Sequence, residues 1–346
     1  MDHGAPPRRE KLDLAAARRI LARADGALSV RSVRIAGEGA KGDVYLAQTD
    51  RGAFAIKLYG REFAARMTKE RRLLARAEGS GLPLPRLVAY DIEDEALGCP
   101  VVVMTALSGE RLVEVIRELR RDELRTLFRR IGELQRGLHE IRFSEYTTFL
   151  PDDGVFDTNL AFMRERVART LHGMTLEGER PRLHGALERH FAEHDELFAP
   201  SAGPVLCHND MHEHNLLVTR DADGSPRITG LIDFENAYAA DELLDLAKTH
   251  NHCHGAGEST LIALIDGYGG LPGEWRPRFE LYELMHAARL FTWYSKGGAR
   301  GPLRRMERRM WRLMGKPEPR DRIADRLARL APTWKTARRT TRRTTR

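Results

Sequence analysis

Cysteine is scarce in this chain, and long apolar runs are missing. The 346 residues include three cysteines, Cys99, Cys207 and Cys253, which lie far apart and form no C-x-x-C pair. Such a set is typical neither of a disulfide framework nor of a thiolate zinc site. No stretch of 18 apolar residues occurs, so we expect no membrane-spanning helix. The first ten residues contain no apolar segment, which predicts a cytoplasmic protein without a secretory signal.

Acidic residues are missing from the C-terminal segment 334–346, which contains six Lys and Arg residues. The formal net charge of the whole chain is +7, so the rest of the chain is nearly neutral. A basic run without interleaved aromatic residues is typical of a solvated, disordered tail. We therefore expect no specific nucleic-acid partner.

Strand-forming residues gather in the first third of the chain, whereas helical periodicity dominates after Gly109. One helical pattern interrupts the early strands, from Arg61 to Glu78. We expect strand-rich segments at 33–58, 88–92, 100–105, 204–207, 216–218 and 228–232. This order predicts an α+β fold with two lobes, a small antiparallel-sheet lobe and a larger, mostly helical lobe.

This order of strands and helices predicts that the chain is divided into three parts. We expect an N-terminal lobe with a leading helix at 1–107, a helical lobe at 108–333 and a disordered basic tail at 334–346. A cleft between two lobes is a natural binding site.

A glycine-rich segment, GEGAKGDV at 37–44, matches the pattern G-x-G-x-x-G-x-V. Glycines allow a strand–turn–strand to close over phosphates and to offer backbone N–H groups, although they also make ordinary hairpins. A strand-like sequence, not a helix, follows the last glycine, which favours a kinase-type loop over a dinucleotide fingerprint. The candidate nucleotide-binding residues of this loop are Gly37, Gly39, Gly42 and Val44.

Lys57 stands among apolar strand residues, fifteen positions after the glycine loop. Burying an ammonium group there is costly unless an anion pairs with it. In the next helix, Glu70 shares one face with the apolar residues Met67 and Leu74. We therefore predict a Lys57–Glu70 pair that positions nucleotide phosphates. The alternative is that Lys57 points outward and Glu70 lies at the edge of the apolar face.

The most specific signal is H-x-D-x-x-x-x-N in HNDMHEHN, residues 208–215, followed by the segment LIDFE at 231–235. Phosphoryl transfer needs a carboxylate near the attacking hydroxyl and oxygen ligands for Mg²⁺. Asp210 suits the first role, and Asn215 and Asp233 suit the second. Neighbouring histidines also invite a zinc interpretation, but they lack convincing ligand spacing.

These motifs resemble the aminoglycoside phosphotransferase family, the antibiotic and small-molecule branch of the protein-kinase-like fold, over roughly Val33 to Lys248. The family's usual His-Gly-Asp stands here as His-Asn-Asp, with Asn209 in place of glycine. Its G-D-P-x-x-D-L-A segment appears as ADELLDLA, residues 240–247.

The resemblance implies a bilobal kinase-like fold and an enzyme that uses ATP, or GTP, with Mg²⁺. It implies Asp210 as catalytic base, Asn215 and Asp233 as Mg²⁺ ligands, and Asp245 as a support for the catalytic loop. It also implies a purine-binding hinge, to which we assign Met104, Thr105 and Leu107. Protein kinases carry D-F-G and a later A-P-E. This chain has Glu235 in place of that glycine and no A-P-E, which disfavours protein substrates.

The expected acceptor is a hydroxylated antibiotic such as an aminoglycoside or aminocyclitol, whose phosphorylation would give resistance or self-protection. A metabolic kinase for choline, homoserine or a methylthioribose-like sugar is the alternative, and a non-catalytic nucleotide-binding pseudokinase is a third. The oligomeric state stays open. A cationic antibiotic would need acids in its pocket. The pool of such acids is Asp152, Asp153, Asp157, Glu165, Glu235, Glu280 and Glu283.

Overall fold

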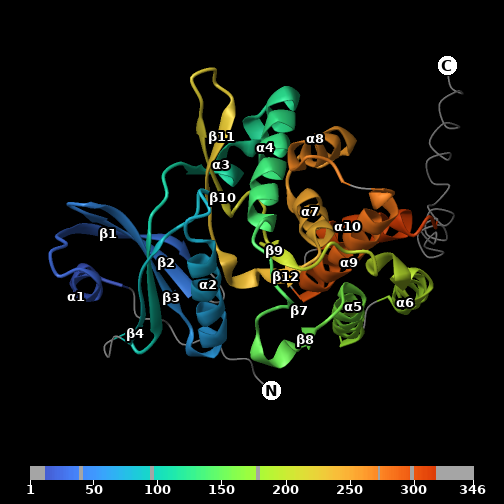
Figure 1. The fold of residues 1–346 in the computed structure, drawn as a ribbon, viewed down its shortest axis with the longest axis horizontal. Coiled ribbons are helices and arrows are strands. Elements are labelled where there is room, and N and C mark those ends of the chain that lie inside the picture. The colour runs from blue at the N-terminus through green and yellow to red at the C-terminus, as the bar shows by residue number, and fades with distance from the viewer. Residues whose placement is uncertain are drawn as a thin grey trace, which may run out of the picture.

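A five-stranded antiparallel sheet forms the N-terminal part of the molecule (Figure 1). The computed structural model describes residues 12–38, 42–93, 97–176, 180–271, 273–296 and 300–316. The strand order is β1-β2-β3-β5-β4. The strands are β1 (Val30–Glu38), β2 (Gly42–Thr49), β3 (Gly52–Tyr59), β4 (Leu87–Glu93) and β5 (Pro100–Thr105).

Two helices flank this sheet, α1 (Leu14–Ala24) and α2 (Ala64–Ala77), the second preceded by a 3₁₀ turn. Side chains of a strand alternate between its faces. Ile56 and Leu58 of β3 therefore pack with α1 in one apolar cluster, whereas Tyr59 packs with α2 in the other. The same alternation turns Lys57 toward α2.

The larger part of the molecule is helical (Figure 1). Its helices are α3 (Leu112–Val115), α4 (Arg121–His139), α5 (Asn159–Leu176), α6 (Pro181–His194), α7 (Glu242–His252), α8 (Glu258–Tyr268), α9 (Trp275–Lys296) and α10 (Arg300–Leu313). Helices α4 and α8 approach closely at two glycines. A Cβ atom on Gly132 would lie 2.1 Å from the Leu264 oxygen, and one on Gly267 would lie 1.9 Å from the Arg129 oxygen. Glycine at both positions therefore sets the contact between these helices.

Two small sheets contain the strands on either side of the loops 208–215 and 232–237. One has the order β11-β10-β6, and the other has the order β8-β7-β12-β9. Their strands are β6 (Glu110–Arg111), β7 (Tyr146–Thr147), β8 (Val155–Phe156), β9 (Val205–Cys207), β10 (Leu216–Arg220), β11 (Pro226–Leu231) and β12 (Tyr238–Ala240). The segment 208–215 runs from β9 to β10, and the segment 232–237 runs from β11 to β12. Strand pairing therefore fixes both ends of both loops.

The predicted fold class is confirmed, with a small antiparallel sheet followed by a mostly helical part. The expected strands near 205, 216 and 228 are present as β9, β10 and β11. The predicted basic tail, 334–346, and Gly39 lie outside the described residues. The division into lobes at residue 107 stays a prediction. None of the described helices is both long enough and apolar enough to cross a bilayer.

Candidate active site

Lys57 lies at the centre of a cluster of carboxylates between the sheet and the helical part. Its Nζ atom is 3.0 Å from Glu70 Oε2, 3.0 Å from Asp233 Oδ1 and 3.5 Å from Glu235 Oε2. Burial lowers the pKa of the Lys57 ammonium group, but Asp233 and Glu70 outweigh it and hold that pKa well above its ordinary value. Lys57 therefore stays charged, and the expected pair with Glu70 is present.

Glu70 joins α2 to the segment that follows β11. Its Oε1 accepts a hydrogen bond from the Phe234 N–H at 2.9 Å, while its Oε2 accepts one from the Tyr59 hydroxyl in addition to Lys57. Glu70 is 1% exposed, so every one of these bonds is shielded from water. The carboxylate thus fixes the position of α2 relative to the Asp233 segment, and both surround Lys57.

Asp233 lies two residues after Leu231, the last residue of β11, and adopts a left-handed backbone with φ 71°. Burial raises the pKa of the Asp233 carboxyl, but the neighbouring Lys57 outweighs this and lowers it. The side chain keeps 33% of its surface exposed, unlike Lys57 and Glu70. Asp233 is therefore an ionised and partly exposed carboxylate.

Asp210 is held by polar groups from three segments. Its Oδ2 accepts from Asn236 Nδ2 at 3.0 Å and from Asn215 Nδ2 at 3.5 Å. Its Oδ1 lies 3.2 Å from Lys248 Nζ and 3.6 Å from His212 Nε2. Burial raises the pKa of the Asp210 carboxyl, but Lys248 and the His212 hydrogen bond hold it well below its ordinary range. Asp210 is therefore an oriented, permanently ionised acceptor of hydrogen bonds.

Asp245 of α7 anchors the loop that carries Asp210. Its Oδ2 accepts from the His208 N–H at 3.0 Å, and its Oδ1 accepts from the Asn209 N–H at 2.6 Å. The His139 ring lies 3.3 Å from Oδ2 through Nε2 and 3.0 Å from the Tyr268 hydroxyl through Nδ1. A fully buried carboxylate with these partners fixes the start of the loop.

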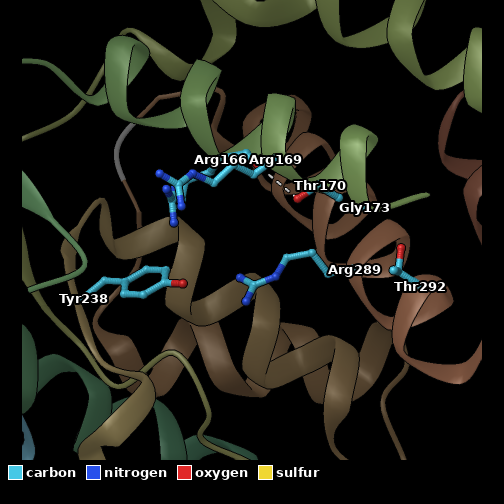
Figure 2. A pocket seen from close by; sticks show the side chains of 7 residues that line it. All are labelled: Arg166, Arg169, Thr170, Gly173, Tyr238, Arg289 and Thr292. Carbon is cyan, nitrogen blue, oxygen red and sulfur yellow. Dashed lines mark hydrogen bonds between the residues drawn. The ribbon is translucent and has the colours of Figure 1, made fainter. Parts of the chain in front are cut away.

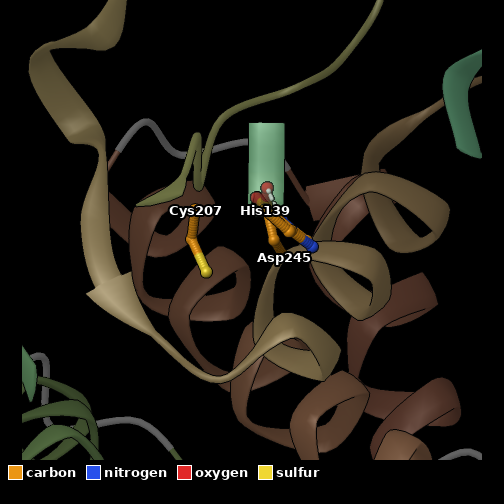
Figure 3. A group of neighbouring side chains, drawn as sticks. All are labelled: His139, Cys207 and Asp245. Carbon is orange, nitrogen blue, oxygen red and sulfur yellow. Dashed lines mark hydrogen bonds and ion pairs between the residues drawn. The ribbon is translucent and has the colours of Figure 1, made fainter. Parts of the chain in front are cut away.

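His139, Cys207 and Asp245 come close enough to suggest a metal site, with ligand atoms within 4.8 Å of one another (Figure 3). However, both Asp245 oxygens accept the hydrogen bonds described above. The Cys207 thiol contacts the Asp241 oxygen at 3.4 Å, and burial raises the thiol pKa well above its ordinary value. Metal ligation requires a thiolate. We therefore interpret this cluster as structural support for the loop 208–215.

Asn209 takes the place of the glycine that is usual in the family and has φ 54°. Asparagine tolerates this left-handed conformation better than other non-glycine residues. Its Nδ2 also donates to the Asn236 oxygen at 2.9 Å, which joins the two loops. Asparagine in place of glycine therefore keeps the left-handed backbone and adds a hydrogen bond between the two loops.

Asn209→Ala is expected to destabilise the fold more than Asn209→Gly. Both variants lose the amide bond to Asn236, but only alanine must hold a Cβ in the left-handed region, at about 1–2 kcal/mol. Denaturant unfolding of the two variants against the wild type measures the difference. Equal free energies of unfolding for alanine and glycine would contradict the strain at this position.

Except for Gly39, the residues predicted for the glycine loop and for the hinge lie within the described part of the chain. Gly37 lies at the end of β1 opposite Val44 of β2, and Gly42 begins β2 opposite Tyr59. At the hinge, Met104 is buried in β5. The N–H groups of the next two residues donate to backbone oxygens of the sheet, at 2.9 and 3.0 Å. Within the described part of the chain, the N–H of Leu107 makes no hydrogen bond, unlike the N–H groups of the two residues before it.

Sequence reasoning missed several residues of this site, namely Tyr59, His139, Asn236 and Lys248. The position of Lys248 in the sequence could have indicated that it belongs to the site. It follows Asp245 by three residues on an apolar helix, so both side chains face the same way. Asn236 had none, because its contact with Asp210 depends on how two separate loops fold.

The sequence suggested a set of acidic residues that could bind a cationic acceptor. Several of these residues form ion pairs with cations of this chain instead. Glu235 lies beside Lys57. Asp153 and Glu165 bind arginines of α5, and Glu283 binds His250 and Arg309. Those carboxylates are already neutralised, so they do not form an acidic pocket.

Comparisons with known proteins agree with this architecture. The model of the phosphotransferase enzyme family matches residues 32–282. The solved structure of the GDP and kanamycin complex of APH(2")-IIia has a TM-score of 0.61 at 16% identity, and the match covers 86% of this chain and 98% of that chain. The GDP complex of aminoglycoside 2'-phosphotransferase-IIIa has a TM-score of 0.64 at 15% identity, covering 88% and 99%.

A third structure is a thermostable mutant of the aminoglycoside phosphotransferase APH(4)-Ia with ADP and hygromycin B. Its TM-score is 0.64 at 16% identity, and the match covers 86% of this chain and 98% of that chain. At these identities the likeness of structures establishes the fold. The family match spans most of the chain and both halves of the site. This chain therefore belongs to the phosphotransferase enzyme family and is a kinase-type phosphotransferase.

Proposed function

We propose that this protein transfers the γ-phosphate of ATP, or of GTP, to a hydroxyl group of a small molecule, with Asp210 as the catalytic base. The observation that carries the proposal is the arrangement of the Asp210 carboxylate. It is fixed by Asn215, Asn236 and Lys248, and its charge acts on Asp233, which pairs with Lys57. Kinase-type transfer depends mainly on positioning and on compensating charge, and these residues supply both.

The nucleotide phosphates would lie under the glycine loop, with Gly37, Gly39, Gly42 and Val44 above them and Lys57 beside them. The Lys57 ammonium group stays charged and is held by Glu70. The hinge residues Met104, Thr105 and Leu107 would border the purine. The fold supports this assignment, because the glycine loop and the hinge both lie next to β3.

The residues fit a Mg²⁺ site. Asp233 offers an ionised, partly exposed carboxylate. Asn215 donates through Nδ2 to the Asp210 backbone oxygen at 2.9 Å, which orients the amide and leaves its oxygen for a ligand. Carboxylate and amide oxygens are ligands that Mg²⁺ prefers. Asp233 and Asn215 would hold the ion, which would neutralise the phosphates when bound.

Asp210 would accept a hydrogen bond from the acceptor hydroxyl and so orient its oxygen. Because Lys248 and His212 keep the pKa of Asp210 low, the carboxylate is ionised at neutral pH. Such a weak base removes the proton late, when the hydroxyl has begun to form its bond to phosphorus. This timing agrees with the loose transition state of phosphoryl transfer.

The acceptor is a small molecule, and an antibiotic remains its first candidate, with a resistance or self-protection role. Kanamycin and hygromycin B bound to the solved relatives support this choice. Metabolic alcohols such as choline, homoserine or a methylthioribose-like sugar are the alternative.

Nucleotide consumption tests the proposal. The protein is mixed with Mg²⁺ and ATP, then GTP, across a panel of antibiotics and small alcohols. We expect at least one acceptor to cause turnover and to gain the mass of one phosphate. Nucleotide binding without turnover of any acceptor would indicate a sensor, and failure to bind nucleotide would refute the proposal.

A further inference from the structure

Three arginines line a cavity of about 240 Å³ between α5, α9 and β12 (Figure 2). Arg166 and Arg169 project from α5, and Arg289 projects from α9 toward the hydroxyl of Tyr238 (Figure 2). No acidic side chain lines this cavity within the described part of the chain. The cavity is therefore positively charged, whereas a pocket that binds a polyamine would need acidic side chains.

Arg166 has donors that the protein itself does not use. The side chain is 9% exposed and pairs through Nη1 with Asp153 at 3.2 Å. Its Nε and Nη2 atoms are buried and form no hydrogen bond with described residues. The Glu165 carboxylate lies 3.9 Å from Nη2, beyond hydrogen-bond distance. Buried unpaired guanidinium donors are costly, and a bound anion would satisfy them.

Arg289 and Arg169 differ in how far the protein neutralises them. Arg169 binds Asp153 at 2.6 Å and Glu165 at 2.6 Å, so its charge is compensated. Arg289 is half-buried and makes no hydrogen bond or ion pair with another residue in the described ranges. The uncompensated charge of the cavity thus comes from Arg289, with Arg166 only partly balanced.

The pKa of Tyr238 is affected by the positive charges around this cavity. Burial raises the pKa of its phenol, but Arg289, Lys69, Arg166 and Lys248 outweigh burial and lower it to about 7. The Lys69 ammonium group lies 5.2 Å from the centre of the ring. The four cations around this buried phenol give the region an excess of positive charge.

One residue that lines the cavity, Tyr238, lies on a strand next to the start of the loop 208–215. Tyr238 of β12 pairs with Cys207 of β9, which directly precedes that loop. Lys248, one of the cations that act on Tyr238, lies 3.2 Å from Asp210 Oδ1. Lys248 therefore links the cavity to Asp210, because its charge acts on Tyr238 and Arg289 while its ammonium group contacts the Asp210 carboxylate.

We infer that the acceptor carries an anionic group, a phosphate or a carboxylate, which binds Arg166, Arg289 and Tyr238 while a hydroxyl of the same molecule faces Asp210. This inference rests on the proposed phosphate transfer and favours anionic acceptors over the cationic antibiotics among its candidates. Guanidinium groups bind both anions in a forked, two-bond geometry. A polycationic aminoglycoside would meet repulsion here.

Anion binding tests the cavity apart from catalysis. Wild-type protein, saturated with Mg²⁺ and ADP so that the nucleotide site is filled, is titrated calorimetrically with inorganic phosphate. We expect binding in the wild type and an affinity at least about tenfold weaker in Arg289→Gln and Arg166→Gln, equivalent to about 1.4 kcal/mol. Arg129→Gln is the matched control, because Arg129 is an exposed arginine that pairs with Asp266 on the outside of α4 and α8.

The outcomes separate the inference from the proposed function. If ADP does not bind, the proposed function fails. If ADP binds but phosphate binding is absent, or is equal in the wild type and Arg289→Gln, the inference fails and the kinase proposal stands.

A turnover panel adds a second test. We expect hydroxylated acids such as glucose 6-phosphate and gluconate to be favoured over glucose and glucosamine, with the preference lost in Arg289→Gln. Because Arg166→Gln breaks a buried pair and can unfold, Arg289→Gln is the deciding variant. Efficient phosphorylation of kanamycin that is unchanged in Arg289→Gln would overturn the inference.

Discussion

Lys57→Met is expected to lower phosphate transfer by about 10²–10³-fold, the usual effect of removing one preorganised donor from a transition state. The substitution keeps the length and apolar part of the side chain but removes the charge. It also leaves Glu70, Asp233 and Glu235 without their shared cation. Steady-state nucleotide turnover measures the loss, once the preferred acceptor is known.

The same variant is expected to be less stable by about 3–5 kcal/mol, because it leaves buried charges uncompensated. Adding Glu70→Gln to Lys57→Met removes one of those charges. We expect the double variant to regain part of the free energy of unfolding but none of the activity. If stability and activity recovered together, Lys57 would be acting only as a structural counter-ion.

Asp245→Asn is expected to uncouple the catalytic loop from α7. The carboxylate accepts two backbone N–H groups, whereas an amide can accept one and must turn its NH₂ group toward the other. The loss is expected to be about 3 kcal/mol in the free energy of unfolding, since hydrogen bonds to buried charges are strong. Transfer activity is expected to fall as well, because Asp210 is on the released loop.

Asp266→Asn is the matched control for this prediction. Asp266 is also an aspartate on a helix of the C-terminal part, but its side chain is 55% exposed and pairs with Arg129 on the surface. We expect little change in stability or turnover for the control. Equal behaviour of Asp245→Asn and Asp266→Asn would show that the buried anchor does not hold the loop.

Much of the site was predictable from sequence because its residues lie in short, regular patterns. The spacing of Lys57 after the glycine loop and the cost of burying its charge predicted an anionic partner, and helical spacing predicted the face of Glu70. The segment 208–215 carries two of the proposed roles within eight residues. These local rules need no knowledge of how distant segments pack.

The charge of the arginine-lined cavity was not predictable in this way. Its arginines come from α5 and α9, which are more than 100 residues apart in the chain, and neither helix has a motif at these positions. The sequence suggested an acid pool that included Asp153 and Glu283. The fold pairs those carboxylates with arginines and histidine instead, so only the packed structure revealed which charges remain uncompensated.

Transfer of a labelled γ-phosphate tests most directly whether this site phosphorylates a small molecule at Asp210. Wild-type protein and Asp210→Asn are incubated with Mg²⁺, γ-labelled ATP and the acceptor panel, and nucleotide binding is measured in both. We expect the label to enter a small molecule in the wild type and the rate to fall by about 10²–10⁴-fold in the variant, with nucleotide affinity retained. Equal transfer by the two proteins, or no transfer to any acceptor, would contradict the proposed role of Asp210.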